Sequence, residues 1–181
     1  MTTEILIAGF GGQGVLSLGK ILAYAAVQEG REVTWLPSYG PEQRGGTSNV
    51  SVVISDERIS SPIVDTYDVV IALNQQSLSK FEPRIKPHGM LLYDSYGIVE
   101  KPHRHDVDVY EMTASQTARD KGVAKMLNMV VAGALISAKP IVSKRSIISA
   151  LHSILPARYQ SLIGENEKAI EAGAKAIKLE C

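Results

Sequence analysis

The residues of this chain that could do chemistry begin with a cluster of glycines near its start. Gly9, Gly11 and Gly14 fit the spacing G-x-G-x-x-G in the segment GFGGQG, which follows an apolar run and precedes a helical pattern. Glycines let backbone N–H groups approach a phosphate closely, and a helix start favours an anion. We expect the turn to bind a nucleotide-like ligand through Gly11, Gly12, Gln13 and Gly14. The alternative is a glycine turn needed only for close strand–helix packing.

The residues that follow the glycines exclude some classes of nucleotide ligand. An NAD site usually has an Asp or Glu at the end of the second strand, where it binds the ribose hydroxyls. Residues 33–38 read VTWLPS and contain no acid, and Glu29 and Glu32 lie before them. A P-loop would need Gly-Lys-Ser or Gly-Lys-Thr after the glycines, and none follows. The sequence therefore disfavours an NAD enzyme and a P-loop nucleotidase.

A second motif, SYGPEQRGG, occupies residues 38–46. It follows the second predicted strand at its carboxyl end, where open α/β sheets usually bind ligands. Arg44 offers a planar fork that suits phosphate or carboxylate, and Gly45 and Gly46 let the backbone turn beside it. We expect these three residues to contact a cofactor. A solvated arginine, or an Arg44 that pairs with Glu42 and shapes an interface, are the alternatives.

The third motif is an asparagine in an apolar helical segment, LNMVVAGAL at residues 127–135. If Asn128 is buried, it must find hydrogen-bond partners, either within the fold or on a ligand. The small residues after it allow a close helix approach. We include Asn128 among the candidate cofactor-binding residues, and a role in fixing a loop stays open.

No further catalytic or metal-ligating set is expected. The only cysteine is Cys181, so neither an internal disulfide nor a four-cysteine cluster can form. The four histidines, at positions 88, 103, 105 and 152, lack metal-site spacing. Lys plus Arg and Asp plus Glu number 19 each, which argues against a general nucleic-acid or membrane-surface binder. The start MTTEILIAGF lacks a basic signal region, and no apolar run could span a bilayer, so we expect a cytoplasmic protein.

The elements that position these motifs alternate between extended and helical patterns. Strands are predicted where β-branched and apolar residues cluster or alternate, at residues 4–10, 32–36, 49–55, 68–73, 89–93 and, at a sheet edge, 107–112. A turn at residues 56–57 is expected to lead into a short return strand. Helices are predicted at residues 15–27, 75–81, 113–121, 123–138, 143–154 and 159–179.

The first strand, glycine turn, helix and second strand form a predicted βαβ unit with a right-handed crossover. The whole order predicts an α/β, Rossmann-like fold, with a mostly parallel sheet flanked by helices and a helical C-terminal extension. We expect one domain over residues 1–181, with an α/β core at 1–140 and the extension at 141–181.

Three segments together resemble the gamma subunit of 2-oxoacid:ferredoxin oxidoreductases: GFGGQGV at residues 9–15, SYGPEQRGGTSN at 38–49 and NMVVAGAL at 128–135. The sequence of the loop resembles most that of the 2-oxoglutarate enzymes, which form succinyl-CoA. The resemblance implies a subunit that contributes to coenzyme A (CoA) binding and assembly. Equivalent subunits of the pyruvate, branched-chain or indolepyruvate enzymes, and a freestanding nucleotide-binding module, are the alternatives.

The resemblance also implies a division of labour between chains. Thiamine diphosphate, Mg and the iron–sulfur clusters are expected on alpha, beta or ferredoxin-like partner subunits, with ferredoxin as electron acceptor. The family's thiamine motif, Gly-Asp-Gly followed by Asn, is absent from this sequence. The chain is therefore expected to be part of an enzyme and not to catalyse the reaction alone.

Overall fold

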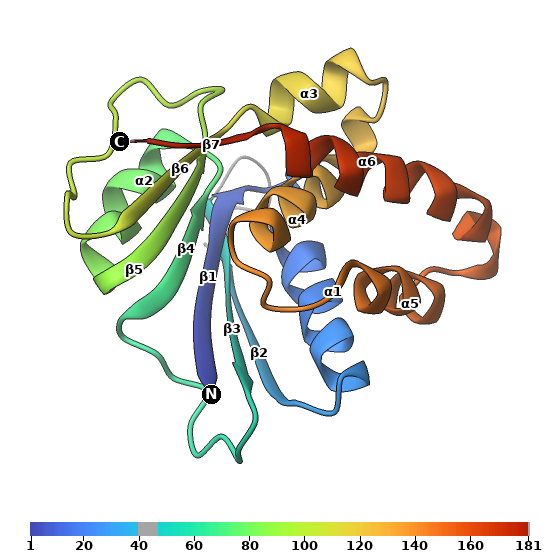
Figure 1. Ribbon diagram of the computed structural model, residues 1–181, viewed down its shortest axis with the longest axis horizontal. Coiled ribbons are helices and arrows are strands. Elements are labelled where there is room, and N and C mark those ends of the chain that lie inside the picture. The colour runs from blue at the N-terminus through green and yellow to red at the C-terminus, as the bar shows by residue number, and fades with distance from the viewer. Residues whose placement is uncertain (40–46, 181) are drawn as a thin grey trace.

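The protein is described by a computed structural model over residues 1–39 and 47–180, built around one seven-stranded sheet (Figure 1). The strand order is β2-β3-β1-β4-β5-β6-β7. The strands are β1 (Thr2–Phe10), β2 (Glu32–Tyr39), β3 (Thr47–Ser55), β4 (Tyr67–Ala72), β5 (Ile85–Asp94), β6 (Asp108–Met112) and β7 (Ile177–Leu179).

The helices cover both faces of this sheet unequally. Five helices lie on one side of the sheet, where α1 packs on β1, β2 and β3 while α5 and α6 pack on α1 and α4; α2 lies on the other side (Figure 1). Alternate residues of β1 point to the two sides: Ile5 and Ile7 join the first core, Leu6 and Ala8 the second. The predicted α/β fold with a helical C-terminal part is confirmed. The helices are α1 (Val15–Gln28), α2 (Gln75–Phe81), α3 (Ala114–Asp120), α4 (Leu127–Ala138), α5 (Lys144–Ile154) and α6 (Ile163–Lys175), with 3₁₀ turns at Glu82–Arg84, Ala124–Met126 and Ala157–Leu162.

The sheet is mixed, so the expectation of a mostly parallel sheet is wrong in that respect. The pairs β1–β4, β4–β5 and β5–β6 are parallel, whereas β2–β3, β3–β1 and β6–β7 are antiparallel. A parallel neighbour needs a crossover of a dozen or more residues, and only residues 40–46 separate β2 from β3. Strand β3 therefore returns antiparallel and inserts between β1 and β2, so the predicted βαβ strands are not direct neighbours.

Three further sequence predictions are wrong. No strand forms in residues 56–66, where a return strand was expected. The stretch 107–112 is not an edge, because β7 pairs with β6 from Met112 to Tyr110. The predicted last helix ends at Lys175, and the residues after it extend alongside β6 instead.

The C-terminal helices pack on the same core as the rest of the molecule. Helix α5 lies along α1, and α6 lies across α4 so closely that an added Cβ at Gly133 would stand 1.9 Å from the Ile170 carbonyl oxygen. The division at residue 140 stays a prediction. Among the described residues, no helix is both long and apolar enough to traverse a bilayer.

Candidate functional site

The predicted glycine turn joins β1 to α1 and takes the backbone angles that glycine allows. Gly12 has a φ of 94° and Gly14, the N-cap residue of α1, has a φ of 77°. Both lie in the left-handed region, where a Cβ is disfavoured. Gly12 and Gly14 are thus required by the turn itself, whatever the turn binds, whereas the backbone at Gly11 does not need a glycine.

Gln13 closes the turn with its side-chain amide. Its Oε1 accepts a hydrogen bond from the Phe10 backbone N–H at 2.6 Å, and its Nε2 donates to the Leu73 carbonyl at 3.1 Å. Leu73 follows β4, so the amide ties the turn to the neighbouring strand. Gln13 therefore shapes the turn, and its side chain is committed to the protein.

The backbone of Gly11 and Gly12 is the exposed part of the turn. Both are exposed, and a Cβ built on either meets no atom of the described residues within 4 Å. Helix α1 has no acidic residue in its first turn and no side-chain cap. Its first N–H groups and the helix dipole therefore face a space that can accept an anion.

Asn128 lies directly against this turn. A Cβ at Gly14 would stand 2.8 Å from the Asn128 Cβ, so the structure brings together two predicted residues that are far apart in the sequence. Asn128 is half-buried in the first turn of α4, and no described residue hydrogen-bonds its amide. Among those residues it does not fix a loop, and a contact of its amide with a ligand stays a prediction.

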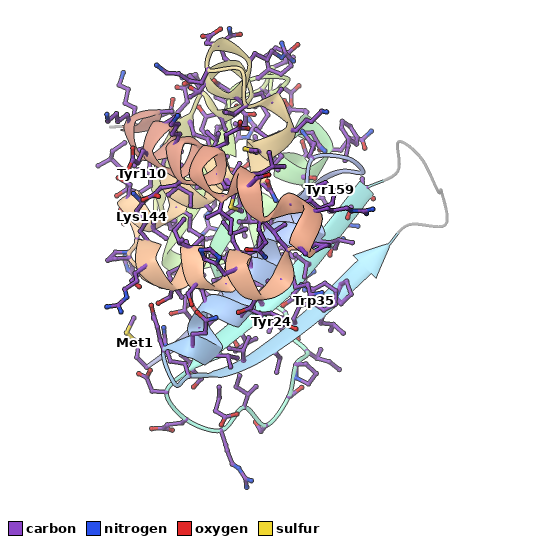
Figure 2. The ribbon with its side chains drawn as sticks, turned by 90° about the vertical axis from the view of Figure 1, so that its right-hand side faces the viewer. Met1, Tyr24, Trp35, Tyr110, Lys144 and Tyr159 are labelled. Atoms are coloured by element: carbon purple, nitrogen blue, oxygen red, sulfur yellow. The ribbon has the colours of Figure 1, made fainter. Side chains whose placement is uncertain are left out.

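A cavity of about 780 Å³ opens beside Asn128. It lies between α1, the start of α4, the end of α5 and the start of α6, in the region labelled by Tyr159 in Figure 2. Its walls are mostly apolar, and its lining residues include two exposed lysines, Lys20 and Lys125. The sequence reasoning missed this cavity, although Ser17, Lys20 and Ile21 have the spacing of one helix face.

Arg44, Gly45 and Gly46 lie outside the described residues. The strands on either side of them can be placed: Tyr39 ends β2, and Thr47 begins β3 paired with Phe10. The base of the motif is therefore at the same end of the sheet as the glycine turn.

Asp94 is a buried carboxyl group at the carboxyl end of β5. Burial raises its pKa, although hydrogen bonds from the Ser115 backbone and hydroxyl and from the Tyr96 backbone act in the opposite direction. Because its oxygens accept these bonds, Asp94 holds the start of α3 in place. Nowhere in residues 1–39 and 47–180 do three or more His, Cys, Asp or Glu side chains gather as a metal site would require.

Comparison with known proteins gives one consistent result. The family model for pyruvate ferredoxin/flavodoxin oxidoreductase matches residues 4–176. The chain is 42% identical to the ketoisovalerate oxidoreductase subunit VorA of Methanothermobacter thermautotrophicus, over 95% of this chain and 36% of that one. It is 36% identical to the 2-oxoglutarate synthase subunit KorC of Methanothermobacter marburgensis, over 98% of this chain and 97% of KorC. It thus spans about a third of VorA but nearly all of KorC.

Two solved structures have the same fold. The gamma subunit of a keto/oxoacid ferredoxin oxidoreductase from Geobacter sulfurreducens superposes with a TM-score of 0.79 at 32% identity, over 96% of this chain and 97% of that chain. The 2-oxoglutarate:ferredoxin oxidoreductase from Magnetococcus marinus, with 2-oxoglutarate, coenzyme A and succinyl-CoA bound, gives 0.87 at 28% identity, over 99% of this chain and 32% of that chain.

Proposed function

Because the chain belongs to the pyruvate ferredoxin/flavodoxin oxidoreductase family, we propose that it is the gamma-type subunit of a 2-oxoglutarate:ferredoxin oxidoreductase. The complex converts 2-oxoglutarate and CoA into succinyl-CoA and CO₂, and two electrons pass to ferredoxin. The match to KorC along nearly its whole length supports this substrate. The bound 2-oxoglutarate and CoA in the Magnetococcus marinus enzyme support the same reaction.

A branched-chain 2-oxoacid is the second candidate substrate. The VorA relative is more identical, at 42%, but this chain covers only 36% of it. Assaying the purified complex with 2-oxoglutarate and with 2-ketoisovalerate, each with CoA and a viologen dye, separates the two. Faster dye reduction with 2-ketoisovalerate would reject the 2-oxoglutarate assignment.

The chemistry at the oxoacid belongs to partner subunits. One cysteine in the whole sequence cannot ligate a four-cysteine cluster. The clusters are therefore proposed to lie on partner subunits. As the family resemblance implies, thiamine diphosphate and Mg are also proposed to lie on alpha, beta or ferredoxin-like subunits, in a cytoplasmic complex. The purified chain alone is expected to reduce no dye, and a tagged copy is expected to capture those subunits from its native cell. A free, monodisperse protein in the cell extract would favour a freestanding nucleotide-binding module.

The role of this chain is to hold a phosphate of CoA at the glycine turn. The observation that carries this role is the uncapped start of α1 beside the open backbone of Gly11 and Gly12. Gly14 and Asn128 border the same space, and Gln13 keeps the turn in shape.

Gly11 offers the sharpest test of this role. Its φ is not positive and its surroundings are open, so a side chain adds no backbone strain there, unlike at Gly12. Gly11→Asp brings a negative charge to the proposed phosphate, and Gly11→Asn is its neutral match in size. In calorimetry on the assembled complex, the Asp variant should bind CoA at least about tenfold more weakly than the Asn variant. Equal affinities would reject the phosphate site.

Arg44, with Gly45 and Gly46 beside it, is proposed to meet an anion at the subunit junction. The anion is either a CoA phosphate or a partner carboxylate. Lysine keeps the charge but loses the planar fork, so both Arg44→Lys and Arg44→Ala should weaken the contact. A raised Michaelis constant for CoA with intact assembly identifies the phosphate, and lost assembly identifies the carboxylate. Normal assembly and turnover in both variants would reject the role.

A further inference from the structure

A buried carboxylate holds the start of helix α3 from a neighbouring strand. Asp94, the last residue of β5, is fully buried. Its Oδ2 accepts hydrogen bonds from the Ser115 backbone N–H at 3.1 Å and from the Ser115 hydroxyl. Thr113, the N-cap residue of α3, makes no side-chain hydrogen bond to the helix start. Asp94 therefore takes the place of an N-cap side chain, and its carboxylate lies where a helix favours an anion.

The far end of α3 is fastened to the same segment of chain. The Arg119 guanidinium carbon lies 4.0 Å from the centre of the Tyr96 ring, a stacking that attracts a cation to the ring. The Tyr96 backbone N–H donates to Asp94 Oδ1 at 3.4 Å. The Ser95 backbone N–H donates to the Met112 carbonyl at 2.9 Å, which fixes the segment to β6. Residues 94–96 thus hold both ends of α3.

Helix α3 leads directly into the residues that border the glycine turn. The Val123 N–H donates to the Ala118 carbonyl at 2.8 Å, and the Met126 N–H donates to the Val123 carbonyl at 2.8 Å. Asn128 follows in the first turn of α4 and packs against Gly14. Backbone hydrogen bonds therefore connect the end of α3 to the start of α4, and a displacement of α3 is passed on to Asn128.

We propose that Asp94 is a positioning residue for CoA binding, an inference that rests on the proposed function. By capping α3, Asp94 holds residues 122–128 at the place beside the glycine turn that the ligand requires. Asp94 is buried and acts through α3 instead of touching the ligand. Without its carboxylate, the Ser115 N–H loses its partner, the start of α3 frays, and residues 122–128 shift away from the turn.

Hydrogen exchange in the assembled complex without CoA tests the positioning itself. Asp94→Ala should speed the exchange of amides in residues 115–128 by about tenfold or more, while amides of β1 keep their protection. Unchanged exchange in residues 122–128 would overturn the proposal, whatever the complex binds.

Asp68→Ala is the matched control for this measurement. Asp68 is a half-buried carboxylate near the start of β4, at the opposite end of the sheet from Asp94. It accepts the Glu4 backbone N–H at 2.8 Å and the Lys86 ammonium at 2.9 Å. Removing it should cost stability as well, but exchange in residues 122–128 should stay as in the parent. Equal acceleration there in both variants would show a general loosening of the fold and overturn the proposal.

Steady-state kinetics of the complex test the consequence for CoA. Asp94→Ala should raise the Michaelis constant for CoA about tenfold, while kcat and the Michaelis constant for the oxoacid stay near the parent values. Asp94→Asn keeps one acceptor oxygen for the Ser115 N–H, so it should raise the constant only about threefold. Asp68→Ala should leave it unchanged. A loss that is equal in all three kinetic parameters would mean that Asp94 only stabilises the fold, and the proposal would be wrong.

Two further outcomes are decided by variants already named. If Asp94→Ala does not assemble, Asp94→Asn decides: a threefold rise in the Michaelis constant for CoA supports the proposal, and the parent value overturns it. If Gly11→Asp weakens CoA binding but the Asp94 variants do not, the phosphate site stands and the positioning role is wrong. If the two Gly11 variants bind CoA equally, the phosphate site is rejected, and a raised constant in Asp94→Ala still supports positioning of residues 122–128.

Discussion

Gln13 and Asn128 are both amides beside one glycine turn, and they use their hydrogen-bonding groups in opposite ways. Gln13 uses its oxygen and nitrogen on Phe10 and Leu73 within the fold. Asn128 has no hydrogen-bond partner among the described residues and faces the cavity. A difference in partners predicts a difference in what each side chain supports, namely stability for Gln13 and binding for Asn128.

This difference can be measured with two alanine variants. Gln13→Ala leaves the Phe10 N–H without its partner and should lower the free energy of unfolding by about 1–3 kcal/mol. Asn128→Ala should change it by less than about 0.5 kcal/mol but weaken CoA binding to the complex. Urea unfolding and calorimetry provide the two readouts. A stable Gln13→Ala protein, or an Asn128→Ala protein that unfolds easily but binds CoA normally, would contradict the division.

The residue scale also shows how far the sequence can predict a site. The glycines were predictable because their spacing and their place between a strand and a helix are local properties. The hydrogen bond from the Gln13 side chain to the Leu73 carbonyl could not be predicted, because Leu73 is 60 residues away in the sequence. The contact of Asn128 with Gly14 and the cavity likewise depend on how distant helices pack.

At the scale of elements, α4 and α6 approach until their backbones touch. A Cβ at Gly133 would lie 1.9 Å from the Ile170 carbonyl oxygen, and a Cβ at Gly173 would lie 1.8 Å from the Val130 carbonyl oxygen. The two glycines thus serve the same crossing from opposite sides. The small residues in 132–134 suggested a close helix approach, but the sequence could not identify the partner helix.

Each of these glycines should resist replacement. Gly133→Ala and Gly173→Ala force the helices apart and should lower the free energy of unfolding by about 1–3 kcal/mol or more. Gly164→Ala is the matched control, because Gly164 lies in α6 with open space around it. There alanine should raise stability by up to about 1 kcal/mol, because it favours the helix. Chemical unfolding of the three variants measures their free energies of unfolding. Similar free energies for all three would contradict the expected loss at Gly133 and Gly173.

An ion pair lies directly beside strand β7. Lys101 Nζ lies 2.6 Å from Glu180 Oε1, and the Glu180 N–H donates to the Val109 carbonyl at 2.9 Å. The Lys101 ammonium lowers the pKa of the Glu180 carboxyl. A lowered pKa means that the stabilisation is complete above the ordinary glutamate pKa and is lost as the pH falls through the lowered one.

Acid should therefore loosen β7 before the rest of the sheet. The Lys101 side chain is 72% exposed, so solvent screens the ion pair and its loss acts locally. Hydrogen exchange of the Glu180 amide should speed up, relative to amides of β4, as the pH falls below the ordinary glutamate value, after correction for intrinsic exchange. Glu180→Gln should show the faster exchange already at neutral pH. Identical protection in both proteins at every pH would show that β7 does not need the pair.

At the scale of the whole molecule, the chain is a unit that relatives use in two ways. KorC is about as long as this chain, whereas VorA and the Magnetococcus marinus chain contain a similar unit within about a third of their length. We therefore expect the unit, where it is a separate chain, to contact the subunits that replace the rest of the longer chain. The mixed strand order leaves β2 as the outermost strand opposite β7. The sequence could not predict this exposure, because it depends on β3 pairing between β1 and β2.

If the proposed function holds, we expect a partner subunit to contact the exposed apolar side chains of β2 and α1. Trp35 is 37% exposed, Leu36 is 43% exposed and Tyr24 of α1 is 45% exposed, and Trp35 and Tyr24 lie on the side seen in Figure 2. Large aromatic side chains dominate binding energy when an interface covers them. No described strand pairs with the outer edge of β2, so its backbone groups are also open to a partner.

Trp35 is the only tryptophan of the chain and can therefore report on its own burial. Fluorotryptophan incorporated into this chain alone should give one fluorine resonance, which shifts and becomes less accessible to a soluble quencher when unlabelled partner subunits are added. Trp35→Ala should weaken assembly by about 2 kcal/mol or more, as at interface hot spots, because truncation removes a covered ring. Val99→Ala is the control, because Val99 is 89% exposed and belongs to neither β2 nor α1; this variant should assemble normally. An unshifted resonance together with normal assembly of Trp35→Ala would show that this face stays free in the complex, and the partner contact would then have to lie on another surface.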